Sequence, residues 1–399
     1  MTQMKSINII SMGPGSEEFI APAAMKLMGQ SEKVFCAERY MSLVPEGKER
    51  PISPLGAALE EIALERENGN EISVLVSGDA GLYSMLETLS RRFGRESLNV
   101  VPGISSLSAF CARLGVSWQG ACILSAHGRK LSPSELCQRV RMNEKVLLLL
   151  DAVHTPRWIK QALTDGGIGN TTLYIGEKVS YPDEYVGEYV ERDYDPLSVA
   201  LIENPSPEKG LPHVGIDDGE FIRGKTPMTK RVIRELIINR LRLTPDAVVW
   251  DIGAGTGSVS IECARQCPLG SVYAIEREED TLELIKQNTA RFRALNLIPV
   301  YGSAPEALED LPVPTHVFLG GSGGKTAEIL RLLRDLHANI RLCATAVTVE
   351  TEYELMQEMS ALDGFEAVQV ASSSIDKIGS YQLRRANNPV TVFAANIGG

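Results

Sequence analysis

The chain lacks an excess of basic residues: its 40 lysines and arginines are outnumbered by 51 aspartates and glutamates, for a formal net charge of -11 over 399 residues. Neutralising the phosphates of a nucleic acid requires a basic surface, so this balance disfavours DNA or RNA as a partner. It also lacks an apolar run long enough to span a bilayer, and residues 1–6 are not a signal peptide. We expect no association with a membrane.

Paired cysteine motifs are missing as well. The seven cysteines form no CxxC pair, and the five histidines are scattered along the chain. This pattern predicts core thiols in a reducing cytoplasm, with neither a disulfide framework nor a metal site. The length exceeds what one hydrophobic core usually serves, so two domains are expected.

A segment rich in proline divides the chain. Residues 204–214 hold three prolines and a glycine among polar residues, which favours a linker over packed structure. Short β-branched runs alternate with helical patterns on both sides, which predicts α/β domains at 1–203 and 215–399. In the first domain, two sets of strands predict two lobes that meet near residue 115.

The second domain has seven predicted strands. The last two, near 366–371 and 390–395, follow each other with a turn and no helix between them. We therefore expect a final antiparallel strand inserted into an otherwise parallel sheet.

The most informative motif of the chain starts at Asp251, directly after a strand-like run. It reads Asp-x-Gly-x-Gly-x-Gly as far as Gly257, and a helical pattern follows at once. Such a turn exposes backbone N–H groups that hold a nucleotide-like cofactor. The next strand ends at Glu276, whose carboxylate can accept hydrogen bonds from both hydroxyls of a ribose. Ser258 replaces the small residue of a dinucleotide fingerprint, so NAD is disfavoured. A glycine-rich turn without a ligand is the other alternative.

The loop after the fourth predicted strand disfavours adenine or cytosine as the substrate. An enzyme that methylates exocyclic base amines would have Asp/Asn-Pro-Pro-Tyr/Phe here, whereas this chain has Gly320-Gly-Ser-Gly-Gly324. A loop almost free of side chains lets a large flat ligand lie close to backbone N–H groups. The segment through Lys325 and Thr326 nearly forms a phosphate-binding loop, but Leu319 replaces its first glycine, so ATP binding is disfavoured.

These motifs resemble two groups of enzymes that use S-adenosylmethionine (SAM). The run from Asp251 with Glu276 resembles motifs I and II of the class I methyltransferases, which have a Rossmann-like, seven-stranded fold. The 320–324 loop, together with Ser303 after the third strand and Thr229 before the first, resembles the decarboxylating precorrin-6B methyltransferases. That family often has aspartate where Ser303 stands, a change that weakens SAM binding without removing the site. The resemblance implies SAM contacts by Thr229, Asp251, Gly253, Ala254, Gly255, Thr256, Gly257, Glu276, Ser303 and Ala304, and tetrapyrrole contacts by Gly320, Gly321, Ser322, Gly323 and Gly324.

The first domain has four glycine-rich loops at the ends of predicted strands. They are Gly13-Pro-Gly15, Gly78-Asp-Ala-Gly81, Gly103-Ile-Ser-Ser106 and Gly176-Glu177. Each alone is a common turn, but their order resembles the tetrapyrrole methylase family, whose two-lobed α/β fold holds SAM between its lobes. The resemblance implies SAM contacts by Gly78, Asp79, Ala80, Ser105 and Ser106, and substrate contacts by Gly13, Pro14, Gly15, His127 and Arg129. His127 is equally consistent with a turn residue.

The order of the two domains resembles the fused, decarboxylating precorrin-6Y methyltransferases of cobalamin biosynthesis. The resemblance implies methylation of a polycarboxylate precorrin, metal-free or cobalt-bearing, at carbons 5 and 15, with decarboxylation of the ring C acetate. It also implies one SAM site per domain and a homo-oligomer. Because the methyl group of SAM is already activated, no nucleophile or metal is required, and no catalytic residue is assigned. Arg384 and Arg385 are candidate ligands for substrate carboxylates.

Two alternatives stay open. Some SAM-dependent tRNA methyltransferases have a similar second domain, although the acidic charge of this chain counts against an RNA substrate. A SAM-binding scaffold with one silent half is the other, and the intact glycine loops in both halves count against it.

Overall fold

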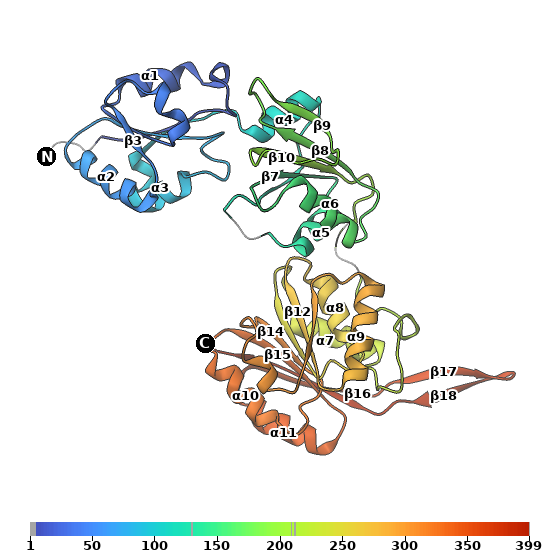
Figure 1. Ribbon diagram of the computed structural model, residues 1–399. Helices are drawn as coiled ribbons and strands as arrows, with labels where there is room; N and C mark the ends of the chain where they lie inside the picture. Colours follow the sequence, from blue (N-terminus) through green and yellow to red (C-terminus); the bar gives the residue numbers. More distant parts are fainter. Residues whose placement is uncertain (1–4, 129–130, 209, 211–212, 399) are drawn as a thin grey trace. The chain divides into compact units, whose positions relative to one another are not determined.

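The computed structural model describes residues 5–128, 131–208, 210 and 213–398. The chain divides into two compact units, Met1–Pro207 and Glu208–Gly399, which are drawn in Figure 1. Within the described residues, every helix is too short or too polar to cross a lipid bilayer.

The first lobe of the first unit is a parallel sheet with helices around it. Its elements are β1 (Ile7–Ser11), η1 (Glu17–Phe19), α1 (Pro22–Gln30), β2 (Lys33–Cys36), η2 (Glu38–Leu43), β3 (Glu49–Pro51), α2 (Leu55–Glu67), β4 (Ile72–Val76), α3 (Leu86–Phe93), η3 (Arg95–Ser97) and β5 (Leu98–Val101). The strand order is β3-β2-β4-β1-β5, and neighbouring strands are all parallel. β1 and β4 are buried throughout and mostly apolar, as expected for central strands covered on both faces.

The second lobe has a mixed sheet. Its elements are α4 (Ser106–Leu114), β6 (Cys122–Ser125), α5 (Pro133–Met142), β7 (Lys145–Leu149), α6 (Pro156–Asp165), β8 (Thr172–Glu177), β9 (Tyr185–Glu188) and β10 (Ser198–Glu203). The strand order is β6-β7-β10-β8-β9, and only the β6–β7 pair is parallel. α4 packs against β7, β9 and β10, so the chain enters this lobe directly after β5.

The second unit is a seven-stranded sheet between two layers of helices. Its elements are η4 (Asp218–Glu220), α7 (Arg231–Leu241), β11 (Val248–Ile252), α8 (Ser258–Gln266), β12 (Ser271–Glu276), α9 (Glu279–Phe292), β13 (Leu297–Tyr301), η5 (Glu306–Leu308), β14 (His316–Leu319), α10 (Thr326–Asp335), β15 (Ile340–Ala346), α11 (Val349–Met359), β16 (Asp363–Val370), β17 (Ser373–Ile378), β18 (Tyr381–Ala386) and β19 (Val390–Ile397). The strand order is β13-β12-β11-β14-β15-β19-β16. One core joins the sheet to α7, α8 and α9, and a second joins it to α10 and α11.

The last strand of this sheet, β19, lies antiparallel between β15 and β16. The predicted fold class is thereby confirmed: α/β throughout, with two lobes in the first half and a Rossmann-like, seven-stranded sheet in the second. The expected simple turn between the last two strands is wrong. β17 and β18 form a separate hairpin there, which extends away from the sheet in Figure 1. Gly379, with φ +63°, occupies the first position of its two-residue turn.

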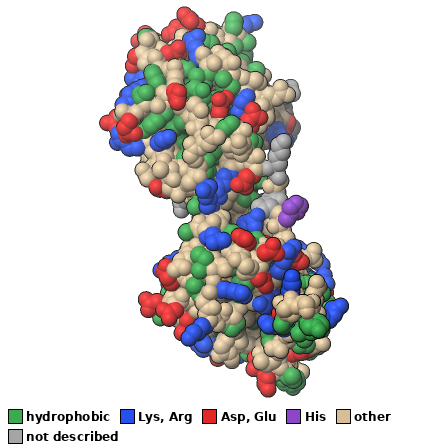
Figure 2. Space-filling model, turned by 90° about the vertical axis from the view of Figure 1, so that its right-hand side faces the viewer, with side chains coloured by type: hydrophobic (Ala, Val, Ile, Leu, Met, Phe, Trp, Pro, Cys, Tyr) green, Lys and Arg blue, Asp and Glu red, His purple; other side chains and the backbone are tan. Residues whose placement is uncertain are grey.

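Acidic and basic side chains are mixed on the surface. On the face of each unit drawn in Figure 2, lysines and arginines alternate with aspartates and glutamates and form no continuous basic stripe. That face therefore does not have the charge pattern by which proteins follow a phosphate backbone.

Candidate functional site

The two glycine-rich loops of the second unit meet at the carboxyl ends of β11 and β14. Residues 253–257 lead from β11 into α8, and residues 320–324 lead from β14 into α10. The backbone N–H groups of Gly320 and Gly321 donate to the carbonyl oxygen of Ile252, at 2.9 and 3.2 Å. This is the point where strand order reverses in the sheet, and ligands of open α/β sheets bind there.

Glu276 holds the first of these loops from the end of β12. Its Oε2 accepts the N–H of Gly255 at 2.9 Å, and its Oε1 accepts the N–H groups of Arg277 and Glu278 at 2.9 and 3.1 Å. The carboxylate is thus fixed in direction before any ligand binds.

A cavity of about 230 Å³ lies between the loops and Glu276. The predicted SAM contacts Gly253, Glu276, Ser303 and Ala304 line it, and so do Gly321, Ser322 and Gly323. Arg277 and Lys325 also line it, and the sequence analysis missed Arg277. Its position directly after the strand-ending Glu276 was the available signal.

Asp251, the first residue of the motif, lies beneath this cavity rather than in its lining. Its side chain is fully buried, and Ser260 Oγ donates to its Oδ2. Burial raises the pKa of Asp251 from 3.8 to about 7, and the hydrogen bond from Ser260 opposes that shift. Asp251 Oδ1 has no hydrogen-bond partner.

A segment without helix or strand, residues 222–229, lies against the first glycine loop. The buried side chain of Asn288 on α9 accepts the N–H of Ile222 at 2.8 Å and donates to the carbonyl oxygens of Ile222 and Thr256, both at 2.9 Å. A Cβ built on Gly255 would lie 3.6 Å from the carbonyl oxygen of Pro227. One amide side chain therefore joins the segment that carries Thr229 to the loop.

A second cavity, of about 350 Å³, adjoins the first. The predicted tetrapyrrole contacts Gly320 to Gly324 line it on one side, and Thr345, Thr348 and Thr351 on the other. Gly321, Ser322 and Gly323 line both cavities. A loop almost without side chains thus forms the wall between them.

In the first unit, three of the four glycine loops are joined at the ends of β1, β4 and β5. Gly13 and Gly78 form an antiparallel bridge, with N···O distances of 3.2 and 2.8 Å. The two carboxylate oxygens of Asp79 accept the N–H groups of Gly81 and Gly103, at 2.8 and 2.9 Å. Asp79 therefore holds the loops together. Ser105 Oγ caps α4 by accepting the N–H of Ser108 at 3.0 Å.

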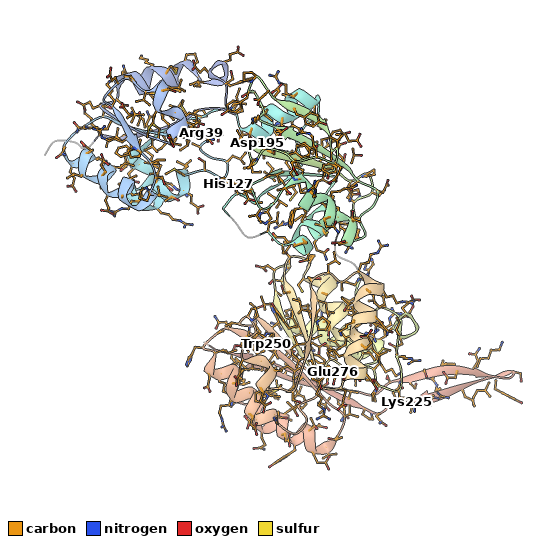
Figure 3. The ribbon with its side chains drawn as sticks, in the orientation of Figure 1. Arg39, His127, Asp195, Lys225, Trp250 and Glu276 are labelled. Atoms are coloured by element: carbon orange, nitrogen blue, oxygen red, sulfur yellow. The ribbon has the colours of Figure 1, made fainter. Side chains whose placement is uncertain are left out.

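A cleft of about 430 Å³ opens between the two lobes. Of the predicted contacts, Gly13, Pro14, Gly78, Ser106 and His127 line it. Sequence reasoning missed several further lining residues, among them Arg39, Tyr40, Tyr83, Tyr181 and Asp195. Figure 3 labels Arg39 on the first lobe and His127 and Asp195 on the second.

The fourth glycine loop closes the same cleft from the second lobe. The ring of Tyr181 lies against Gly15, where a Cβ would come within 2.1 Å of Tyr181 Cε2, and Ser16 N–H donates to Ser180 Oγ at 2.9 Å. Glu177 Oε1 accepts the N–H of Asp195 at 2.6 Å. The predicted Gly176-Glu177 pair thus positions the cleft wall at Asp195.

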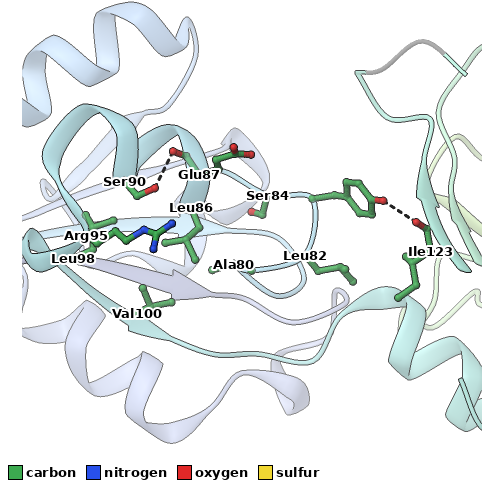
Figure 4. A pocket seen from close by; sticks show the side chains of 12 residues that line it. Ala80, Leu82, Ser84, Leu86, Glu87, Ser90, Arg95, Leu98, Val100 and Ile123 are labelled. Atoms are coloured by element: carbon green, nitrogen blue, oxygen red, sulfur yellow. Dashed lines mark hydrogen bonds between the residues drawn. The ribbon is translucent and has the colours of Figure 1, made fainter. Parts of the chain in front are cut away.

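A larger cavity, of about 710 Å³, lies on the other side of the Gly78–Gly81 loop, and Ala80 lines it (Figure 4). Leu82 and Tyr83 line both this cavity and the cleft. Tyr83 has φ +49°, and its hydroxyl donates to the carbonyl oxygen of Ile123 at 2.7 Å, which ties the two lobes (Figure 4).

The remaining predicted contacts have other positions. Arg129 lies outside the described residues. Arg384 and Arg385 lie on the exposed strand β18 and line neither cavity of the second unit, and Arg385 Nε pairs with Asp376 at 3.1 Å. Their role as substrate ligands stays a prediction. Among the described residues, no group of His, Cys, Asp and Glu side chains could hold a metal ion.

Comparison with known proteins agrees with this division of the chain. Residues 6–193 match the tetrapyrrole (corrin/porphyrin) methylases, and residues 220–396 match the precorrin methyltransferase domain. The chain is 28% identical over 400 residues to precorrin-6Y C(5,15)-methyltransferase [decarboxylating] of a Sinorhizobium species. The alignment covers 97% of this chain and 95% of that protein.

Two relatives from Salmonella typhimurium each match about half of the chain. Cobalt-precorrin-6B C(15)-methyltransferase (decarboxylating) is 37% identical over 44% of this chain and 93% of its own length. Cobalt-precorrin-7 C(5)-methyltransferase is 29% identical over 49% of this chain and 98% of its own length. With both domain families matched in this order, the chain belongs to the family of decarboxylating precorrin-6Y methyltransferases.

Proposed function

We propose that this chain is a bifunctional, SAM-dependent C-methyltransferase of cobalamin biosynthesis. The second unit methylates a precorrin at carbon 15 and decarboxylates its ring C acetate, and the first unit methylates carbon 5. The observation that carries the proposal is the presence, in one chain, of two glycine-loop clefts built on different folds. The names of the two half-length relatives support one activity for each unit.

The residues of the second unit fit a bound SAM. The carboxylate of Glu276 accepts three hydrogen bonds from backbone N–H groups. A carboxylate can accept about four, so it keeps capacity for a ribose hydroxyl in the cavity that it lines. When bound, SAM supplies an electrophilic methyl group. The protein's part is to orient the reacting groups, which requires rigid loops more than reactive side chains.

We place the reacting edge of the tetrapyrrole in the neighbouring cavity of about 350 Å³, which is smaller than the whole ring system with its side chains. A flat ring system there faces the cofactor cavity across the 320–324 loop, where no side chain larger than that of Ser322 intervenes. In the decarboxylation the bond between the acetate methylene carbon and its carboxylate breaks, CO₂ leaves, and the electron pair passes into the conjugated ring. A proton from solvent then adds to the methylene carbon and converts it into a methyl group. Arg277 and Lys325 line the cofactor cavity on the other side of this loop, where each pairs with a carboxylate, Glu278 at 3.3 Å and Glu306 at 2.7 Å.

In the first unit, the interlobe cleft is the corresponding site. The N-terminus of α4, at Ser106, and the joined loops at Gly13 and Gly78 surround it with backbone groups. We propose one SAM site in this cleft and one in the second unit, so that the chain binds two SAM molecules.

The function is tested by mass spectrometry. Precorrin-6B, metal-free or cobalt-bearing, is incubated with the full chain and methyl-labelled SAM. The proposal predicts a product with two labelled methyl groups that has lost CO₂, from whichever substrate form turns over. An unchanged mass with both forms, despite measurable SAM binding, would overturn it, and methylation of tRNA in a parallel incubation would favour the RNA alternative.

A further inference from the structure

One cation in the interlobe cleft has no acidic partner. Arg39 lies on η2 and lines the cavity of about 430 Å³ (Figure 3). Its guanidinium carbon lies 4.9 Å from the centroid of the Tyr40 ring, a distance at which a cation is attracted to the aromatic face. Among the described residues, no acidic side chain lies within 4.0 Å of the guanidinium nitrogens.

The acidic side chain in the cleft lining has partners of its own. Asp195 Oδ2 lies 3.5 Å from Lys178 Nζ, which also pairs with Asp183 Oδ2 at 2.8 Å, and Asp195 Oδ1 accepts the N–H of Leu197 at 2.8 Å. His127 is the other residue of the lining that can carry a positive charge. The exposed guanidinium of Arg39 is thus left without a carboxylate partner among the described residues, in a cleft whose remaining lining is backbone, hydroxyl groups and apolar side chains.

We infer that Arg39 binds a carboxylate of the tetrapyrrole substrate in this cleft. The inference rests on the proposed function, and it names the residue and the substrate group that meet. Arg39 and Tyr40 line the cleft together with Gly13 and Pro14, the loop expected to face the substrate. The planar fork of an arginine can hold both oxygens of a carboxylate, and stacking on the Tyr40 ring restricts its direction beforehand.

The test compares three full-length proteins: wild type, Arg39→Gln and Arg39→Lys. We expect Arg39→Gln to raise the KM of the carbon 5 reaction for the tetrapyrrole by about tenfold to a hundredfold, the effect of losing hydrogen bonds to a charged group. The kcat at saturating tetrapyrrole and the Kd for SAM stay unchanged. The KM of Arg39→Lys should lie between those of wild type and Arg39→Gln, because lysine keeps the positive charge but lacks the planar fork of arginine.

Arg91→Gln is the matched control, since Arg91 is exposed on α3 and paired with Glu87 outside the cleft. It removes the same charge and should leave the KM unchanged. SAM has a carboxylate of its own, so weaker SAM binding by Arg39→Gln would overturn the inference in favour of a cofactor contact. An unaltered KM would overturn it as well. Both results require an active wild type, whereas failure of the proposed function would leave the wild type itself inactive.

Discussion

Gly253 and Gly321 touch each other through their backbones. A Cβ on Gly253 would lie 2.7 Å from the carbonyl oxygen of Gly321 and 2.9 Å from its nitrogen, and Gly253 has φ +74°. Both the close approach and the left-handed backbone require glycine. The contact sets the separation of the two loops that line the cavity of about 230 Å³.

Gly253→Ala should therefore push the two loops apart. We expect CO₂ release, the reaction specific to the second unit, to fall by about a hundredfold, as a displacement of roughly 1 Å does in other sites. The measurement is the rate of CO₂ release at saturating SAM and tetrapyrrole. Gly219→Ala is the control, because a Cβ there meets nothing within 4 Å. Equal rates for both variants would contradict the account.

Glu276→Gln keeps the size of the side chain and loses its charge. In place of Oε2 the variant has an amide NH₂ group, which cannot accept the hydrogen bond from the N–H of Gly255. The loop at Gly255 therefore loses its anchor. We expect SAM to bind one of its two sites about tenfold to a hundredfold more weakly. Calorimetric titration of the full chain measures both sites. Glu283→Gln, an exposed change on α9, should leave both affinities intact, and two unchanged sites in Glu276→Gln would refute this role.

Asn288→Asp retains the acceptor for Ile222 N–H and removes the donors to the carbonyl oxygens of Ile222 and Thr256. Leaving buried carbonyl groups unpaired costs about 1–3 kcal/mol in the free energy of unfolding. We also expect a higher KM for SAM in CO₂ release, because segment 222–229 is no longer held on the loop. Urea denaturation and SAM kinetics test the two effects. The exposed neighbour Gln287→Ala should change neither.

The buried Asp251 predicts a dependence of stability on pH. Its pKa is raised from 3.8 to about 7, so the folded protein holds this proton more tightly than the unfolded chain does. Between these values the unfolded side chain ionises first, and the free energy of unfolding falls as pH rises. Below about pH 4 and above about pH 7 this contribution is constant.

Asp251→Asn cannot ionise, so the variant should gain stability relative to wild type as pH rises across that window, by on the order of a few kcal/mol. Urea denaturation of both proteins between about pH 4 and 8 measures the difference. A constant difference across the window would show that Asp251 is ionised in the folded protein.

Local sequence patterns predicted the fold well because burial leaves a local signature. β1 and β11 are short, mostly apolar runs in the sequence, and the glycines after β11 predicted the turn into α8. The β17–β18 hairpin was missed although Gly379-Ser380 is a two-residue turn between alternating strands. Its strands are almost entirely exposed, and their few apolar residues, such as Ile375 and Leu383, are too sparse to stand out as a buried strand.

The residues around the glycine loops were harder to predict, since contacts between distant segments depend on topology. Tyr181 and Gly15 meet only because the second lobe returns to the first, and Asn288 reaches Thr256 from a separate helix. The role of Asp79 illustrates the same limit. Its motif predicts a position at the cleft. No local pattern reveals that its two oxygens accept hydrogen bonds from the backbone N–H groups of Gly81 and Gly103.

The most direct test of two independent active units is complementation between variants. Gly103→Ala, whose Cβ would come within 2.5 Å of Ser11 Cβ, disables the first unit, and Gly253→Ala disables the second. With precorrin-6B and labelled SAM, we expect Gly103→Ala alone to release CO₂ and add one methyl group, and Gly253→Ala alone to release CO₂ about a hundredfold more slowly. A mixture of the two variants should yield the doubly methylated, decarboxylated product. A mixture no more active than its components would contradict the assignment of one methylation to each unit.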